Sequence, residues 1–491
     1  MVLLGLDVGT ASAHAVAIDE IGTILASAAL AYPTQSPRPG WIEQDPADWW
    51  RAASHVLAGV AAESGGEIGA LGLTGQAGSV FVDGRGDPVR PAILGSDRRA
   101  ASQAELMSGR IGARHVIEIT GSPAQIGHQA PNILWLRDVE PVQFRHTRRV
   151  LLPKDHLRLM LTGEAATDST DAAGTLLLDL RRRNWSDELL DALEIPIAWM
   201  PPVHGSTEIA GGLRLSLAGE LGLPAGLPVA AGAGATAAAA VSIGIVAAGL
   251  IGSSIGRDGL LVAPINDVMV DPSGWLQTAC DPAPQRYQVT GKIASAGGSL
   301  RWWRDILGGR FGYEELCAQA ESVAVGADGL FFVPQVDGDA TPLHGAGARG
   351  AFVGLRAHHT QADLTRAVLE GVVFSLRDRL EVMRGLGIQP HQARATGGGA
   401  RSRLWRQMQA DIFALPVGSM ATAPSPALGA ALLAGVATGV FSDVAAAAAT
   451  VARLDTVLEP HSERVAHYEQ LYRTFSALDP AIRQPLARRP T

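Results

Sequence analysis

The chain has 491 residues, of which 47% are hydrophobic and 18% charged, and its formal net charge is −8. This balance excludes a disordered chain, which needs low hydrophobicity and high charge, and without a basic stripe we expect no nucleic-acid partner. Cys280 and Cys317 are too few for a disulfide framework or a zinc site. The 57 glycines make up about 12% of the 491 residues, above the roughly 7% of average proteins. They indicate many tight turns or close backbone approaches.

The N-terminal segment alternates between strand and helix signals. Apolar residues at 2–6 and 15–18 predict strands, and a turn at 19–22 leads into a further strand. Asp45-Pro46 predicts a helix start, with an N-cap followed by proline at the first helical position. Residues 68–74 predict another strand. This alternation indicates an α/β fold.

A second strand–turn–strand start lies in the middle of the chain. Residues 249–255 and 260–262 predict strands joined by a turn at 256–259, as at the N-terminus. The repeat predicts two domains of related architecture, residues 1–243 and 244–491. Further predicted elements are a strand at 393–396, a glycine turn at 397–399, and helices at 363–384, 402–413, 426–439 and 443–450.

Residues 221–256 carry no charged side chain, and this run is long enough to cross a bilayer. Pro224 and Pro228 interrupt it, however, and Gly and Ala outnumber Leu and Ile. We therefore predict a buried crossover and no membrane contact. The acid at position 7 and the lack of a basic start argue against a signal peptide, so a cytoplasmic protein is expected.

Asp7-Val8-Gly9-Thr10 follows the first predicted strand. Glycine in a tight turn between strands lets backbone N–H groups approach a phosphate. A carboxylate at the end of the strand can hold Mg²⁺, directly or through water. Alone the tetrapeptide is a weak signal, and Asp7 could equally cap a turn.

Further motifs follow in order along nearly the whole chain. They are Asp7–Thr10, Gly40–Pro46, Arg90–Leu94, Leu151–Asp155, Asp171–Thr175, Arg366–Val372, Gly397–Ser402, Trp405–Met408 and Pro426–Ala431. Each is weak by itself, but in number and order they resemble the FGGY family of carbohydrate kinases.

The resemblance implies two actin-like (ribonuclease-H-like) ATPase domains with an interdomain cleft, the sugar side in residues 1–243 and the nucleotide side in 244–491. It implies ATP and Mg²⁺ as cofactors, a small sugar or polyol as the phosphate acceptor, and a possible homodimer. It places the metal at Asp7. By the same resemblance the nucleotide-binding residues are Gly9, Thr10, Gly256, Arg257, Gly397, Gly398, Gly399, Ala400 and Ser402, and the substrate-binding residues are Gln76, Ala77, Gly78, Ala235 and Thr236.

The sequence departs from the family where the chemistry is carried. Ala235 and Thr236 stand where the family has its proton-accepting Asp and the following Asn. No Asp or Glu lies between Glu220 and Asp258, so a shifted alignment cannot restore the base. General-base catalysis contributes about 10²–10⁴-fold, or on the order of 3–5 kcal/mol of barrier. The family's Gly-Gln-Met-His segment reads Gly-Gln-Ala-Gly at 75–78 and lacks both large side chains.

Three hypotheses remain open. The protein is a working sugar kinase with a relocated base, or it binds nucleotide without transferring phosphate, or its cleft serves another small ligand and ATP binding is lost. For the first, Asp97 is the candidate catalytic base, because the resemblance places its segment beside the sugar. The alternative for Asp97 is a surface residue paired with Arg98 or Arg99, and such a pair would lower its basicity.

Overall fold

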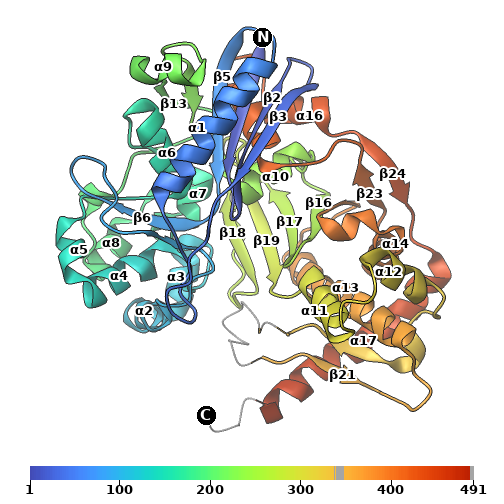
Figure 1. Cartoon of the computed structure of the whole chain (residues 1–491). Coiled ribbons are helices and arrows are strands. Elements are labelled where there is room, and N and C mark those ends of the chain that lie inside the picture. The colour runs from blue at the N-terminus through green and yellow to red at the C-terminus, as the bar shows by residue number, and fades with distance from the viewer. Residues whose placement is uncertain (337, 339–347, 487–491) are drawn as a thin grey trace.

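The computed structural model describes residues 1–336, 338 and 348–486. The chain forms two lobes, with the N-terminal part on the left and the C-terminal part on the right of Figure 1. A seven-stranded sheet lies in each lobe. The first contains β1 (Val2–Val8), β2 (Ser12–Ile18), β3 (Ile24–Ala31), β5 (Ile68–Gly75), β13 (Ile209–Gly212), β14 (Pro228–Ala230) and β15 (Ala233–Gly234). The second contains β16 (Leu250–Ile255), β17 (Gly259–Ile265), β18 (Leu276–Cys280), β19 (Tyr287–Ile293), β22 (Gln392–Thr396), β23 (Val417–Met420) and β24 (Leu454–Leu458).

The two sheets begin alike. In the first, the antiparallel pair β1–β2 is joined by β5, which runs parallel to β1. In the second, the antiparallel pair β16–β17 is joined by β22, which runs parallel to β16. The repeated strand–turn–strand start predicted from the sequence is thus confirmed. The division at residue 243 stays a prediction.

Shorter strands build small sheets around the first lobe and at one end of the second. They are β4 (Glu43–Gln44), β6 (Gly78–Val82), β7 (Ala92–Leu94), β8 (Arg149–Leu151), β9 (Thr167–Asp168), β10 (Leu178–Asp179), β11 (Asn184–Trp185), β12 (Val203–His204), β20 (Phe331–Val333) and β21 (Ala351–Val353). The helices of the first lobe are α1 (Pro46–Glu63), α2 (Ala101–Met107), α3 (Ala113–Thr120), α4 (Gln129–Val139), α5 (Pro141–His146), α6 (Pro153–Thr162), α7 (Ser169–Ala173), α8 (Asp187–Leu193), α9 (Leu215–Leu221) and α10 (Ala235–Ser242). Those that follow are α11 (Gly297–Ile306), α12 (Tyr313–Glu321), α13 (Gln361–Gly385), α14 (Arg403–Phe413), α15 (Pro426–Ala437), α16 (Val444–Val451) and α17 (Ser462–Leu486).

Side-chain caps set the starts of two predicted helices, and the cap at Asp45 was itself predicted. Asp45 precedes α1, and its Oδ1 accepts a hydrogen bond from the Ala47 N–H at 2.9 Å. Ser425 caps α15 through the Leu428 N–H at 3.1 Å. Asp443 was expected inside its helix, but it is the N-cap of α16. An N-cap residue supplies an acceptor to the free N–H groups of the first turn, which explains this one-residue difference.

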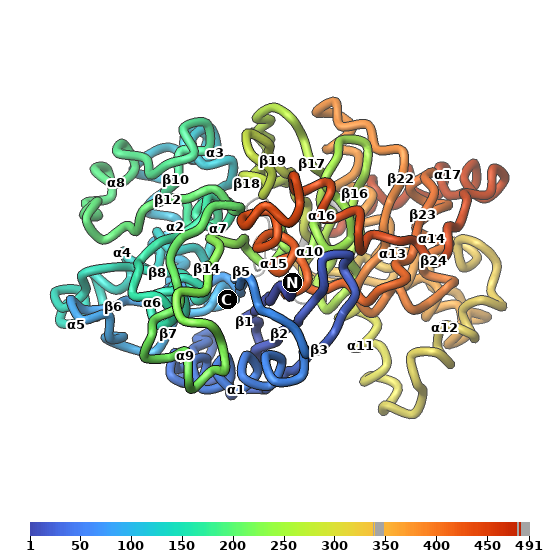
Figure 2. The backbone as a smooth tube through the Cα atoms, turned by 90° about the horizontal axis from the view of Figure 1, so that it is seen from above, coloured from blue at the N-terminus to red at the C-terminus, as the bar shows by residue number. Residues whose placement is uncertain are grey.

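The uncharged run 221–256 contains β14, β15, α10 and all of β16, so it forms the crossover between the sheets. Helix α10 packs on α15, and α15 packs on β1 and β5 although it lies far along the chain. Figure 2 shows both helices at the centre of the molecule, between the strands of the two sheets. Within the described residues, no helix combines the length and the apolar character needed to cross a membrane.

Glycine lets α15 approach its neighbours at backbone distance. A Cβ on Gly5 would lie 1.9 Å from the Ala427 carbonyl oxygen, and a Cβ on Gly72 would lie 1.9 Å from that of Ala430. A Cβ on Gly429 would lie 1.9 Å from the Ala238 oxygen. Part of the glycine excess therefore serves helix–sheet and helix–helix contact rather than turns.

Gly5→Ala is expected to lower the free energy of unfolding by about 3 kcal/mol or more, because a methyl group meets rigid backbone. The matched control is Gly219→Ala in α9, where nothing lies within 4 Å of the added carbon. That change should leave stability equal or raise it by up to about 1 kcal/mol. Urea unfolding of both variants checks the prediction, and equal midpoints would contradict it.

Candidate functional site

Three segments predicted to carry the site meet at one edge of the first sheet. Asp7 pairs with Thr74 and Val8 with Gly75 where β1 and β5 run side by side. Ala233 and Gly234 of β15 pair with the same two residues of β5. Because parallel strands end at a common edge, Asp7 near the end of β1 lies there together with Gln76 and Ala235, which directly follow β5 and β15. We call this the carboxyl edge.

Asp7 presents an unsatisfied carboxylate at the carboxyl edge. Its Oδ1 is buried and has no hydrogen-bond partner. Burial raises the pKa of Asp7 to about 7, because a buried charge loses its hydration. A bound cation would satisfy such an oxygen, so the residue fits the predicted Mg²⁺ position. Beside it the turn is held by the Gly9 N–H, which donates to the Ser12 oxygen at 3.0 Å.

Gln76 and Thr10 are tied together by Gln44, which was not predicted as a site residue. Gln76 Nε2 donates to Gln44 Oε1 at 2.8 Å, and Gln44 Nε2 donates to the Thr10 carbonyl at 2.8 Å. Trp49 Nε1 also donates to Gln44 Oε1 at 2.8 Å. These bonds fix the Gln76 side chain and the chain after Asp7. The signal available in the sequence was the place of Gln44 in the Gly40–Pro46 motif.

Asp97 lies in a buried ion-pair network. Arg99 donates to it from Nε at 2.9 Å and from a terminal nitrogen at 2.7 Å, and the Arg99 and Ile42 backbone N–H groups also donate to it. The side chains of Asp97 and Arg99 are both fully buried, and the Arg99 guanidinium lies 3.9 Å from the ring centre of Trp41. These contacts match the ion-pair alternative, although at a buried position. With its oxygens occupied, Asp97 is not favoured as the proton acceptor.

The predicted nucleotide residues of the second lobe also come together. The turn Gly256-Arg257 joins β16 to β17, and the Gly297 N–H at the start of α11 donates to the Gly256 oxygen at 2.8 Å. Gly397 has φ +75°, and a Cβ there would lie 2.6 Å from the Ile255 oxygen. Only glycine fits that backbone without strain. The glycine turn continues as a 3₁₀ helix, Gly398–Arg401, which includes Gly399 and Ala400.

Ser402 closes this segment as the N-cap of α14. Its Oγ accepts a hydrogen bond from the Trp405 N–H at 3.2 Å. The structure thus brings Gly256, Arg257 and Gly397–Ala400 together, and it gives Ser402 a helix-capping contact.

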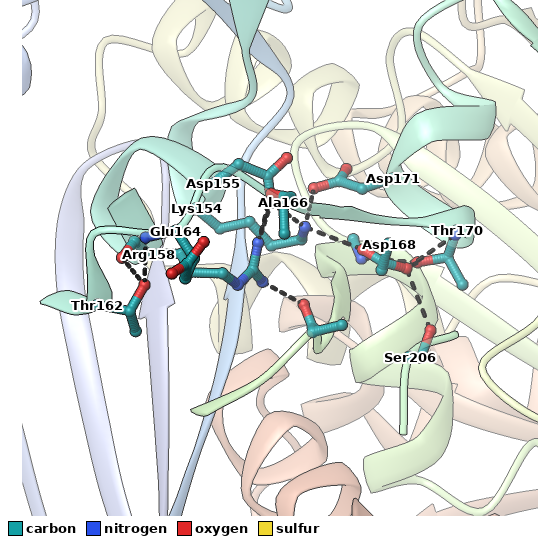
Figure 3. A network of polar contacts seen from close by, with 12 residues as sticks. Lys154, Asp155, Arg158, Thr162, Glu164, Ala166, Asp168, Thr170, Asp171 and Ser206 are labelled. Carbon is teal, nitrogen blue, oxygen red and sulfur yellow. Dashed lines mark hydrogen bonds and ion pairs between the residues drawn. The ribbon is translucent and has the colours of Figure 1, made fainter. Parts of the chain in front are cut away.

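A buried cluster of charged side chains, not predicted from the sequence, joins α6 to α7 (Figure 3). It lies next to the β15–α10 loop, where Gly234 ends β15 and Ala235 begins α10. Lys154 Nζ lies 2.6 Å from Asp155, 2.9 Å from Asp168 and 3.3 Å from Asp171. Arg158 lies 2.7 Å from Asp155. We call these five residues the lysine cluster. Lys154 and Asp155 belong to the Leu151–Asp155 motif, and Asp171 begins the Asp171–Thr175 motif. Nothing in the spacing of these motifs indicates that Lys154 reaches α7.

The lysine cluster contains two cations and three carboxylates. Burial lowers the pKa of Lys154, but the carboxylates of Asp155, Asp168 and Asp171 together raise it by more than burial lowers it. The net shift of the pKa is therefore upward. Burial raises the pKa of Asp171 to about 7, with Asp168 and Asp155 adding to the rise and Lys154 opposing it. Of the three carboxylates, that of Asp171 also lies farthest from the Lys154 ammonium group.

Comparison with known proteins places these features in a family. The model of the N-terminal domain of the FGGY family of carbohydrate kinases matches residues 2–242, and that of the C-terminal domain matches residues 266–438. The chain belongs to this family and has its two-domain actin-like (ribonuclease-H-like) fold.

Within the family the chain is xylulokinase-like. It is 35% identical to a xylulose kinase of Lactococcus lactis, over 96% of this chain and 95% of that protein. It is 37% identical to a xylulose kinase of Escherichia coli, over 88% of this chain and 90% of that protein. The crystal structure of a xylulose kinase from Brucella ovis superimposes with a TM-score of 0.93 at 33% identity, covering 98% of this chain and 99% of that one. These relatives support a sugar kinase function.

Proposed function

We propose that the protein transfers the γ-phosphate of ATP to a hydroxyl group of a small sugar or polyol other than D-xylulose. The observation that carries the proposal is the unsatisfied Oδ1 of Asp7, at the same sheet edge as Gln76 and the start of α10. Phosphoryl transfer needs positioning of both reactants and neutralisation of phosphate charge. Asp7 would hold Mg²⁺, which supplies that neutralisation when it is bound.

The remaining predicted residues divide between the two ligands. Backbone groups of Gly9 and Thr10 and of the glycine segments at 256–257 and 397–400 would bind the nucleotide phosphates and the face of the nucleoside. Gln76, held by Gln44 at 2.8 Å, would orient the acceptor. Both cofactors, the expected homodimer and the cytoplasmic location remain predictions.

The choice of acceptor follows from the small side chains at Ala77, Gly78 and Ala235. These positions offer no polar group to a sugar hydroxyl, whereas the corresponding family segment has methionine, histidine and aspartate. A site that loses a hydrogen bond to its substrate discriminates against that substrate strongly. Poor activity with D-xylulose is therefore expected.

A second candidate function is nucleotide binding without transfer, and Ala235 favours it, because alanine cannot accept a proton. A third is binding of another small ligand with no nucleotide. Calorimetric titration separates them: ATP binding without turnover supports the second, and no binding of ATP or ADP up to millimolar concentration leaves the third.

Turnover of ATP across a panel of ketoses and polyols tests the proposal. We expect ADP release that depends on at least one acceptor and is slow with D-xylulose. Brisk turnover with D-xylulose would contradict the argument from Ala77 and Gly78. No acceptor-dependent turnover with any member of the panel would contradict the transfer itself.

A further inference from the structure

We propose that Asp171 is the proton acceptor of this enzyme, in place of the aspartate that the family has at the position of Ala235. The inference rests on the function proposed above. It identifies a catalytic residue that is supplied by α7 rather than by the loop before α10.

Asp171 lies directly against that loop. A Cβ built on Gly234 would lie 2.9 Å from Asp171 Oδ1, so a larger residue there would force the carboxylate to shift. The Gly234 N–H donates to Thr170 Oγ1 at 2.9 Å, which ties α7 to the loop. Gly234 is the residue before Ala235. The Asp171 carboxylate therefore occupies the neighbourhood in which the family's carboxylate is expected.

The other two carboxylates of the lysine cluster are fully enclosed, and each has one oxygen that accepts several hydrogen bonds and one oxygen without a hydrogen-bond partner. Asp155 Oδ1 accepts from Lys154 at 2.6 Å and from Arg158 at 2.7 Å. Asp168 Oδ2 accepts from the Thr170 backbone and hydroxyl and from Ser206 Oγ at 3.1 Å. Both residues are 0% exposed, whereas Asp171 is 8% exposed. Asp171 is thus the member of the cluster that an entering hydroxyl can reach.

The contacts of Asp171 leave one oxygen for a substrate. Its Oδ2 faces Lys154 Nζ at 3.3 Å and has no hydrogen-bond partner. Its Oδ1 faces Gly234. Lys154 holds the carboxylate in place from one side, and Oδ1 is the atom directed toward the loop. A general base works best when its pKa lies near the operating pH, and burial brings that of Asp171 to about 7.

The proposed step transfers one phosphoryl group and one proton. The acceptor hydroxyl oxygen forms a bond to the γ-phosphorus, and its proton passes to Asp171 Oδ1. The bond from the γ-phosphorus to the bridging oxygen breaks, and its electron pair leaves on ADP. The protonated Asp171 returns its proton to water when the products have left.

Asp171 belongs to a motif shared with the family, Asp171–Thr175, so the residue is not new to this chain. The difference lies at position 235. Where relatives have a second carboxylate beside it, this chain has a methyl group, and Asp171 becomes the carboxylate nearest the loop.

Three variants test the inference once an accepted substrate is known: Asp171→Asn, Ala235→Asp and the double variant. Asp171→Asn is expected to lower kcat at least about 100-fold while calorimetric ATP affinity stays within a few-fold. The variant should fold, because it removes the excess negative charge of the lysine cluster. In the double variant, the carboxylate at 235 should raise kcat at least tenfold above that of Asp171→Asn. Asp187→Asn, an exposed position, should behave as wild type.

The single variant Ala235→Asp tests whether the wild-type protein already has a proton acceptor, even if Asp171→Asn does not fold. If Asp171 already accepts the proton, adding a carboxylate at 235 should raise kcat less than about tenfold. A gain of 100-fold or more would show that wild type lacks a base and would overturn the inference. Nearly unchanged turnover in a folded Asp171→Asn variant would overturn it too, as would no rescue in the double variant. Absence of any wild-type turnover would instead contradict the proposed function.

Discussion

Asp7→Asn is expected to abolish measurable phosphoryl transfer, with a loss of at least about 100-fold in turnover. The amide keeps the size of the side chain but removes the charge that would hold Mg²⁺, and a metal contributes several kcal/mol to the transition state of such a reaction. The stability of the fold should not fall with it. Without Mg²⁺ the variant should melt no lower than wild type, because a neutral amide costs less to bury than the carboxylate whose Oδ1 has no partner.

Thermal melting with and without Mg²⁺ separates this result from a general defect. A ligand that binds the folded state stabilises it, so Mg²⁺ should raise the melting temperature of wild type and not that of Asp7→Asn. Glu105→Gln, an exposed change, serves as the control and should respond as wild type. An equal Mg²⁺ response in wild type and Asp7→Asn would contradict the metal role.

Lys154→Met is expected to lower the free energy of unfolding by about 3–5 kcal/mol, because removing one member of a buried ion-pair network leaves its partners without compensation. Lys154 is 1% exposed and lies within 3.3 Å of three carboxylates. In the variant the pKa of Asp171, which burial raises and Lys154 opposes, rises further, so Asp171 keeps its proton more strongly in the folded state than in the unfolded chain. The folded state therefore binds more protons, and the stability of the variant should fall as the pH rises.

Chemical denaturation at pH 5 and pH 8 measures both parts of this expectation. The loss relative to wild type should be larger at pH 8. Arg114→Met is the control, since Arg114 is 80% exposed and its pair with Glu118 is a surface pair of one helix, worth about 0.3–0.5 kcal/mol. Equal losses for the two variants would contradict the description of the lysine cluster.

Features with a local physical cause could be predicted from the sequence. Asp45 starts a helix by accepting a hydrogen bond from a backbone N–H group only two residues further on. Gly397 adopts a left-handed backbone within a glycine turn. The pairing of Asp97 with Arg99 joins residues two apart. The burial of that pair could not be predicted, because Trp41 and Trp135 cover it from distant segments.

Features that depend on distant segments could not be predicted. Gly5 is required because any larger residue would meet the backbone of α15. That helix lies near the other end of the chain. The lysine cluster joins α6 to α7, and only the folded chain shows that Asp171 lies against Gly234. The motif around Ala235 marked the missing carboxylate, but the side chain that could replace it became visible only through this contact.

The product of the reaction distinguishes phosphoryl transfer to a sugar hydroxyl from simple hydrolysis of ATP. Wild-type protein is incubated with ATP, Mg²⁺ and each sugar or polyol of the panel, and the phosphorus species are identified by ³¹P NMR. An enzyme that uses Asp171 to accept the proton of a bound hydroxyl should form ADP and a phosphate monoester in equal amounts. ADP with inorganic phosphate and no monoester, or no ADP at all, would contradict the account.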